Sequence, residues 1–272
     1  TGAAIEALGQ TTLLNTGTIS NALGAAMRFG AANDVLILGT GSQIVGTSDG
    51  GTGTDTLRLN SEAGLVQALG RFDNFETLEV LAGTWNVAGN SGSFGTIGIS
   101  GGELGVTGTI AGNVTTSGSG TFRLGSGGSI GGFTGDIVND GRLIIDIGSN
   151  FDVSGSFSGS GLFTKQGGGT VSFLGGYNFA GTTQLLGGGI RIAGAINPST
   201  VFDLQSGTLD LTGSTTTTIA GLSGTSGSSL LLGGTSNLTV NQATDTVYAG
   251  SISGSGSMLK QGDGRLNLTG TN

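Results

Sequence analysis

Short runs in which apolar and polar residues alternate recur along this chain. Three of them lie 21 residues apart, at residues 34–38 (DVLIL), 55–59 (DTLRL) and 76–80 (ETLEV). Each run begins with an acid, and its third and fifth residues are aliphatic. Successive side chains of a β-strand point to opposite faces, so the two aliphatic residues of each run share one face. The spacing predicts that consecutive repeats stack, with equivalent leucines in one column.

After these runs the repeat varies in length but keeps one signature: glycine, any residue, an apolar residue, any residue, an apolar residue. The signature begins at Gly83, Gly102, Gly120, Gly141, Gly169, Gly188, Gly207 and Gly264. Repeats of about 20 residues built on short alternating strands are typical of a parallel β-helix. We therefore predict an all-β fold, a right-handed parallel β-helix (β-solenoid) with roughly 20 residues per coil. It would form one continuous domain over residues 1–272.

The dimensions of such a helix are reasonable for a chain of this length. About 13 coils stacked at ~4.8 Å would give a rod of roughly 60 Å. An immunoglobulin-like or other β-sandwich is the alternative fold. A leucine-rich repeat is excluded because its Asn-ladder spacing and its helical segments are absent. Residues 3–8 and 62–69 alone have a helical pattern, and both stretches are short.

Composition separates this chain from a disordered one. Glycine accounts for 59 of the 272 residues, proline for one, and charged residues for 10%. Disorder requires low hydrophobicity and high net charge. Here 35% of the residues are apolar, and the mean hydropathy is positive. The chain can therefore bury a core, and its glycines and small polar residues separate many short strands.

Charge and missing residue types exclude several classes of function. The net charge of −8, with nine basic residues spread along the chain, argues against nucleic acid as a partner. The absence of cysteine excludes disulfides, thiol catalysis and zinc–thiolate sites. The absence of histidine excludes a Ser-His-Asp triad and any histidine metal site. We expect no cofactor and no metal, and we see no signal peptide and no apolar run of about 20 residues.

A longer unit occurs twice, at residues 155–185 and, incompletely, at residues 250–272, and both copies contain Lys-Gln-Gly-x-Gly. It resembles the passenger-associated transport repeat of bacterial autotransporters, whose consensus reads roughly G-x-G-x-L-x-K-x-G-x-G-x-L-x-L-x-G-x-N-x-Y-x-G-x-T. Tyr177 stands where Asn is usual, and Phe179 replaces the Tyr. The motif positions are Gly159, Gly161, Lys165, Gly167, Gly169, Val171, Phe173, Phe179, Gly181, Thr183, Gly254, Gly256, Lys260, Gly262, Gly264, Leu266 and Leu268.

The resemblance implies a fragment of an autotransporter passenger, exported across the outer membrane through its own C-terminal β-barrel, which lies outside this chain. Such a passenger is extracellular or on the bacterial cell surface, attached to or released from the outer membrane. In that family these repeats are associated with export and folding of the passenger. The leading function is therefore a β-helical stalk or scaffold that supports export, folding and adhesion. The alternatives are a self-associating adhesin that causes cell aggregation or biofilm, or binds a host or matrix surface, and a polysaccharide-acting enzyme.

One motif raises the question of calcium. Residues 50–57 (GGTGTDTL) fit the G-G-x-G-x-D-x-U nonapeptide of toxin-type β-rolls. In that fold, consecutive copies share the ion through aspartate and main-chain carbonyl oxygens. Here consecutive copies are absent: Asp34 lies 21 residues before Asp55 and follows a degraded version of the motif. We therefore favour an Asp-Thr turn that caps a strand.

Acids and aromatic residues supply the remaining candidates for chemistry. The densest acidic group comprises Asp136, Asp140, Asp146 and Asp152, with Arg142 among them. Carboxylate pairs serve in glycosidases. However, Asp140 and Arg142 would both point outward, where a weak salt bridge explains the pair. We therefore predict that this segment is not an enzyme.

The aromatic residues that could stack on sugars are Trp85, Tyr177, Phe179 and Tyr248. Trp85 occupies an apolar slot of the repeat signature, so we expect it in the core. Tyr177 and Phe179 match the aromatic region of the longer unit, and we expect them to cap or staple a coil.

Overall fold

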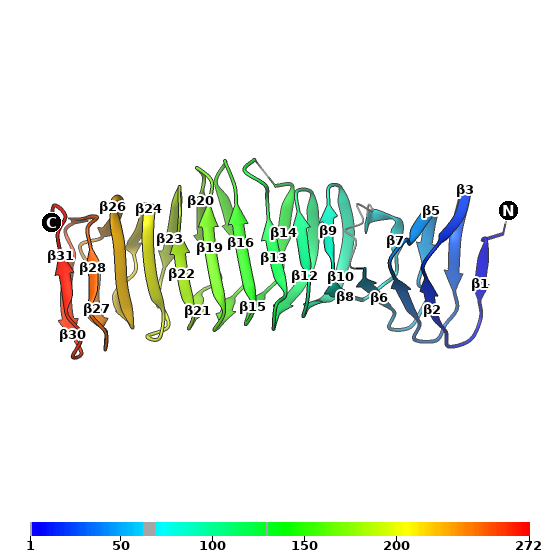
Figure 1. Cartoon of the computed structure of the whole chain (residues 1–272), viewed down its shortest axis with the longest axis horizontal. Coiled ribbons are helices and arrows are strands. Elements are labelled where there is room, and N and C mark those ends of the chain that lie inside the picture. Colours follow the sequence, from blue (N-terminus) through cyan, green and yellow to red (C-terminus); the bar gives the residue numbers. More distant parts are fainter. Residues whose placement is uncertain (1, 62–68, 129) are drawn as a thin grey trace. The chain divides into compact units, whose positions relative to one another are not determined.

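The computed structural model describes residues 2–61, 69–128 and 130–272. Among them it contains β-strands, turns and one short 3-10 turn, η1 (Leu69–Arg71), but no α-helix (Figure 1). Within the same ranges, no helix is long and apolar enough to span a membrane. The strands form a parallel β-solenoid of about 13 turns with roughly 20 residues per turn, as the repeat predicts.

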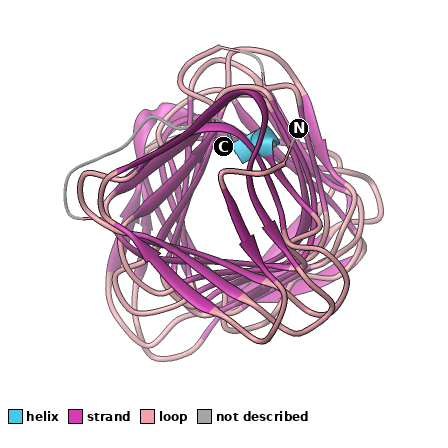
Figure 2. Cartoon of the chain, turned by 90° about the vertical axis from the view of Figure 1, so that its right-hand side faces the viewer, coloured by secondary structure: helices cyan, strands magenta, loops and turns pink. Residues whose placement is uncertain are grey.

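The chain divides into two compact units. Unit 1 comprises Thr1–Arg123 and Ile130–Gly135, and unit 2 comprises Leu124–Ser129 and Asp136–Asn272. The strand β13 (Thr121–Leu124) has residues in both. In the coils of Figure 2, strands lie along the faces and loops project at the corners.

Unit 1 contains three ladders of parallel strands. In one, β1, β3, β5 and β7 follow each other, and in the second β2, β4, β6, β8, β10 and β12 do, with β14 against β12. In the third, β9 pairs with β11. The strands are β1 (Ile5–Ala7), β2 (Thr12–Asn15), β3 (Thr18–Phe29), β4 (Val35–Leu38), β5 (Gln43–Asp49), β6 (Thr56–Asn60), β7 (Phe72–Asp73), β8 (Thr77–Ala82), β9 (Thr84–Val87), β10 (Asn90–Ile99), β11 (Glu103–Val106), β12 (Thr109–Thr116) and β14 (Gly132–Thr134).

The 21-residue spacing gives the register of the second ladder. Leu36 pairs with Leu57, and Leu57 pairs with Leu78. All three side chains are fully buried, as are the aliphatic residues two positions further along each strand. The predicted column of leucines is therefore confirmed, because a period of two residues puts both aliphatic positions on the inner face.

Unit 2 continues the same kind of parallel pairing. The strands β15, β18 and β21 form one ladder, and β25, β27 and β30 form another, while the rest belong to one large sheet. The strands are β15 (Ile137–Asn139), β16 (Arg142–Asp146), β17 (Phe151–Val153), β18 (Phe157–Gly159), β19 (Leu162–Gln166), β20 (Thr170–Phe173), β21 (Tyr177–Phe179), β22 (Thr182–Leu185), β23 (Gly189–Ala193), β24 (Val201–Gly213), β25 (Thr216–Ile219), β26 (Gly221–Leu232), β27 (Asn237–Asn241), β28 (Thr246–Tyr248), β29 (Ser251–Gly254), β30 (Ser257–Gln261) and β31 (Leu266–Leu268).

The two stretches with a helical pattern have different outcomes. Residues 3–8 do not form a helix: Ile5–Ala7 is strand β1, which pairs with residues 27–29 of β3. The prediction was wrong because pairing with a neighbouring coil outweighs the weak local preference of a few helix-forming residues. Of the second stretch, residues 62–68 lie outside the described residues, and Leu69 begins the turn η1.

Candidate functional site

Lys165, the lysine of the first copy of the longer unit (residues 155–185), is buried. Lys165 lies near the end of strand β19, and a glycine-rich turn begins at Gly167. Lys165 is two residues after Phe163, so both side chains point to the inner face. The exposed fraction of Lys165 is 0%.

The Lys165 ammonium group is held by main-chain carbonyls. Nζ donates hydrogen bonds to the carbonyl oxygens of Gln166 at 2.6 Å, Gly167 at 3.0 Å and Gly187 at 3.4 Å. Gly187 belongs to the next coil, so one side chain links two coils. Burial lowers the pKa of Lys165 from 10.5 to about 8, and the charge of Asp146 opposes this shift.

This lowered pKa predicts a rise in stability with pH. Between pH 8 and 10.5 the unfolded chain holds a proton on Lys165 that the folded chain has begun to lose. The free energy of unfolding should therefore increase with pH, by at most about 1.4 kcal/mol per unit. Urea unfolding between pH 7 and 9.5 measures this increase, and Lys165→Met should lack it. A Lys165→Met chain with the wild-type slope would contradict the assignment, and Lys260→Met is the matched control.

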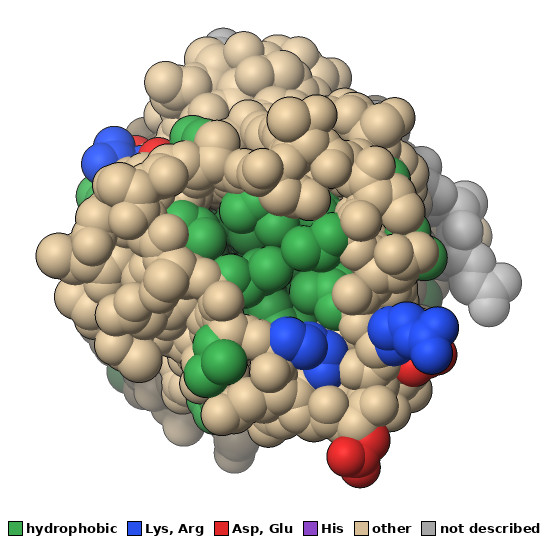
Figure 3. Space-filling model, turned by 90° about the vertical axis from the view of Figure 1, so that its left-hand side faces the viewer, with side chains coloured by type: hydrophobic (Ala, Val, Ile, Leu, Met, Phe, Trp, Pro, Cys, Tyr) green, Lys and Arg blue, Asp and Glu red, His purple; other side chains and the backbone are tan. Residues whose placement is uncertain are grey.

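The second copy of the repeat makes fewer of these contacts. Lys260 Nζ donates to the carbonyl oxygens of Gln261 and Gly262, but no bond to a further coil is present among the described residues. Its strand β30, like β31, pairs with a neighbour on one side. Leu266 and Leu268 are correspondingly more exposed than their counterparts Val171 and Phe173, which are buried. Figure 3 shows apolar side chains gathered in the middle of this end of unit 2.

The motif glycines lie where one coil touches the backbone of the preceding one. A Cβ added at any of them would lie 2.0–2.5 Å from a main-chain carbonyl oxygen of that coil, a distance that real Cβ atoms essentially never show. At Gly159 this close approach is combined with a φ of 106°, which favours glycine. The nine positions are Gly159, Gly161, Gly167, Gly169, Gly181, Gly254, Gly256, Gly262 and Gly264.

An aromatic cluster fills the interior of the first copy. The ring of Phe157 stacks on Phe179 at 4.6 Å and on Phe173 at 5.0 Å between centroids. Edge-to-face contacts with Phe163 and Tyr177 complete its surroundings. The Tyr177 hydroxyl is hydrogen-bonded to the hydroxyl of Thr183, so the tyrosine that departs from the consensus pairs with another motif position. Burial raises the pKa of Tyr177.

The aromatic residues considered as sugar platforms lie inside the coils. Trp85, Tyr177, Phe179 and Tyr248 are all at most 1% exposed. Trp85 Nε1 donates to the carbonyl oxygen of Ala82, and Tyr248 Oη donates to that of Ser251. Their polar atoms are thus satisfied within the fold, and none of these rings is available to stack on a ligand.

The acidic group around Asp140 caps backbone groups of neighbouring coils. Asp140 Oδ1 accepts hydrogen bonds from the Ser160 backbone N–H at 2.9 Å and from its hydroxyl. Asp136 Oδ1 accepts from the Ser156 N–H at 2.7 Å, and Asp146 accepts from the Gln166 side chain at 2.8 Å. The expected salt bridge between Asp140 and Arg142 was wrong. Ion pairs of the described residues include Arg58–Glu79, Arg123–Glu103 and Arg191–Asp210.

A second set of acids forms a ladder that we had not recognised. The carboxylate of Asp34 accepts the Thr11 N–H at 2.6 Å, that of Asp55 accepts the Asp34 N–H at 2.6 Å, and that of Glu76 accepts the Asp55 N–H at 2.7 Å. Asp55 therefore caps the start of a strand, as expected, but the strand is β4 of the preceding coil. The signal was present in the sequence, because an acid opens each of the three runs.

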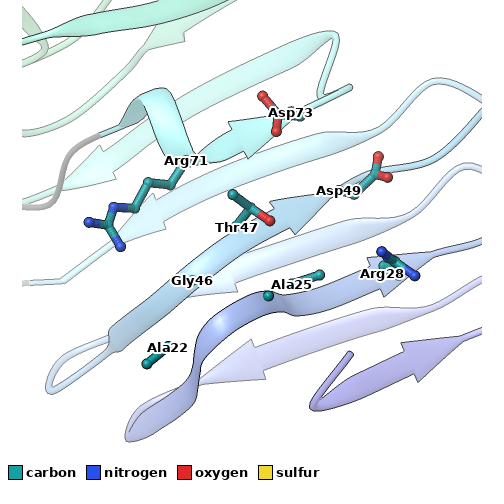
Figure 4. Close-up of a pocket in the computed structure, with 9 residues that line it drawn as sticks. Ala22, Ala25, Arg28, Gly46, Thr47, Asp49, Arg71 and Asp73 are labelled. Atoms are coloured by element: carbon teal, nitrogen blue, oxygen red, sulfur yellow. The ribbon is translucent and has the colours of Figure 1, made fainter. Parts of the chain in front are cut away.

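A hollow of about 530 Å³ lies beside β3, β5 and β7 in unit 1. Asp49 and Asp73 are paired on neighbouring strands, and Arg28 and Arg71 also line the hollow (Figure 4). Neither arginine belongs to an ion pair of the described residues. The hollow thus presents both charges on an exposed surface. Nowhere in the described ranges do three or more acidic side chains gather in a way that could hold a metal ion.

Comparison with known proteins bears on the identity of this solenoid. No protein-family model and no solved structure matches the chain. The adhesin BmaC autotransporter of Brucella suis biovar 1 (strain 1330) is 31% identical to this chain over an alignment of 273 positions, gaps included. The alignment covers 86% of this chain. The solenoid and this similarity fit an autotransporter passenger domain. The chain spans 7% of the length of that relative, and both copies of the longer repeat unit lie in unit 2.

Proposed function

We propose that this chain is a stalk segment of an autotransporter adhesin, and that it supports export, folding and adhesion of the passenger at the bacterial surface. The similarity to an autotransporter named an adhesin supports the general role. The contact from Lys165 to the Gly187 carbonyl supports the finer role, since it ties the coil of Lys165 to the coil that follows it. The passenger would be extracellular, attached to or released from the outer membrane.

The physical basis of this proposal is stacking in sequence order. Strands of unit 2 pair in parallel with the strands about 20 residues before them, as β19 does with β16 and β22 with β19. A folded coil therefore offers main-chain partners and an apolar surface to the coil that follows it. Folding outside the membrane would oppose backward movement of the chain. The partner in export would be the C-terminal β-barrel of the same protein, outside this chain, and nucleic acid is not a partner.

Deletion of residues 155–272 from the full-length protein, with the barrel retained, tests this role. We expect lower surface display, measured by antibody labelling of intact cells at matched expression. A matched control deletes the same length without a transport-type repeat, for example residues 6–123, and should display better than the test deletion. Unchanged display of the test deletion would overturn the proposed role in export. Normal display with lost cell settling would instead make these residues the adhesive surface, through other copies of the chain or a host or matrix surface.

A further inference from the structure

The acid ladder of unit 1 contains two carboxylates that are only half satisfied. Asp34 and Asp55 are both 0% exposed. Each uses Oδ1 to accept a backbone N–H from the preceding coil. Within the described residues, the Oδ2 atom of each is buried and has no hydrogen-bond partner. An unpaired buried charge lowers the stability of the fold. A bound group that contacts the two oxygens would remove this cost.

The surroundings of these oxygens are acidic. Burial raises the pKa of Asp55, and charge repulsion from Glu76, Asp34 and Asp49 adds to this rise. Asp49 is itself engaged, because its Oδ1 accepts from the Gly51 N–H at 3.0 Å and from the Asn74 side chain at 2.8 Å. A cation would satisfy both oxygens directly and offset the repulsion.

We propose that Asp34 and Asp55 hold one calcium ion between their coils. The two residues precede strands β4 and β6, whose register pairs Val35 with Thr56, so the aspartates stack one above the other. Stacked positions are separated by ~4.8 Å. Calcium binds oxygen at about 2.3–2.6 Å, so an ion between two oxygens spans about 4.6–5.2 Å. The coil spacing therefore matches an ion shared between consecutive carboxylates.

The remaining ligands would be main-chain carbonyls of the adjoining turns and water, since calcium takes six to eight oxygens. This site differs from the toxin-type β-roll, whose consecutive nonapeptides share the ion. Here the sharing residues are one 21-residue coil apart, and two carboxylates rather than three contribute. Affinities of about 10⁻⁴–10⁻³ M are typical of extracellular calcium modules.

The test is calcium binding and unfolding of the 272-residue chain at pH 7.5, after treatment with a chelator. Calorimetric titration with CaCl2 should give about one ion per chain. At ten times the dissociation constant, the ratio of folded to unfolded chain should rise about elevenfold, and MgCl2 at equal ionic strength should have a smaller effect. Asp34→Asn and Asp55→Asn keep the oxygen that caps the backbone but should lose the calcium response.

Asp140→Asn is the matched control, because Asp140 caps a backbone N–H in the same way but is exposed. It should keep the full calcium response. The proposal is overturned if calcium has no effect on the unmodified chain. It is overturned as well if the Asp34 and Asp55 variants respond to calcium as strongly as the unmodified chain does. It is also overturned if lowering the pH to 5 stabilises the calcium-free chain while calcium at pH 7.5 does not, since the carboxyls would then bind protons.

Discussion

Phe157→Ala is expected to lower the free energy of unfolding of unit 2 by about 3–5 kcal/mol. The ring is fully buried and has aromatic neighbours from its own coil and from the next. Truncation removes the apolar surface of the ring and also leaves a cavity between rings that cannot close, because their backbones are fixed by strand pairing. Each lost aromatic contact adds about 0.5–1.5 kcal/mol to the effect of area alone.

Urea unfolding measures this loss, and hydrogen exchange of β18 and β21 shows whether it is local. Leu174→Ala is the control, since this side chain is 61% exposed and its removal should change stability by less than about 0.5 kcal/mol. A loss at Phe157 no larger than at Leu174 would mean that the cluster does not hold these coils together. Phe157→Leu should fall between the two, because it keeps most of the apolar volume.

The solenoid was predictable from sequence because its strands repeat a simple alternation. Leu36, Leu57 and Leu78 lie in the predicted column. The residues that point to the inner face follow from the two-residue period of side chains along a strand. Local preference was less informative. Ile5–Ala7 forms a strand because β3 offers it a parallel partner, and no pattern within residues 3–8 contains that information.

The interior polar contacts were the part that sequence did not reveal. A lysine is rarely buried, so the repeat motif alone did not predict an interior position for Lys165. Its position two residues after Phe163 was the signal for one, but its acceptors are main-chain carbonyls whose positions depend on the fold. The sequence did show that an acid begins each run, at Asp34 and again at Asp55. Its role became visible only with the backbone of the preceding coil, whose N–H groups the two carboxylates cap.

Gly169→Ala should separate two coils, whereas Gly168→Ala should be tolerated. A Cβ at position 169 would lie 2.1 Å from the Ser149 carbonyl oxygen, with the carbon and nitrogen of the same residue also within 3 Å. These are backbone atoms of the turn between β16 and β17, so they cannot rotate away as a side chain could. A Cβ at Gly168 would meet nothing within 4 Å. We expect a loss of about 1–3 kcal/mol or more for the first change and less than about 0.5 kcal/mol for the second.

Chemical unfolding of the two variants compares the same substitution at two neighbouring glycines, of which Gly168 is exposed and Gly169 is buried. Equal stability would mean that coil spacing relaxes to admit a methyl group, and that glycine at motif positions reflects turn formation alone. The second copy makes the argument general. A Cβ added at Gly264 would likewise lie 2.3 Å from the Thr244 carbonyl oxygen, so Gly264→Ala should also destabilise the fold. If stacking of coils sustains export, surface display should fall in the order of these stability losses, with Gly168→Ala near the unmodified level.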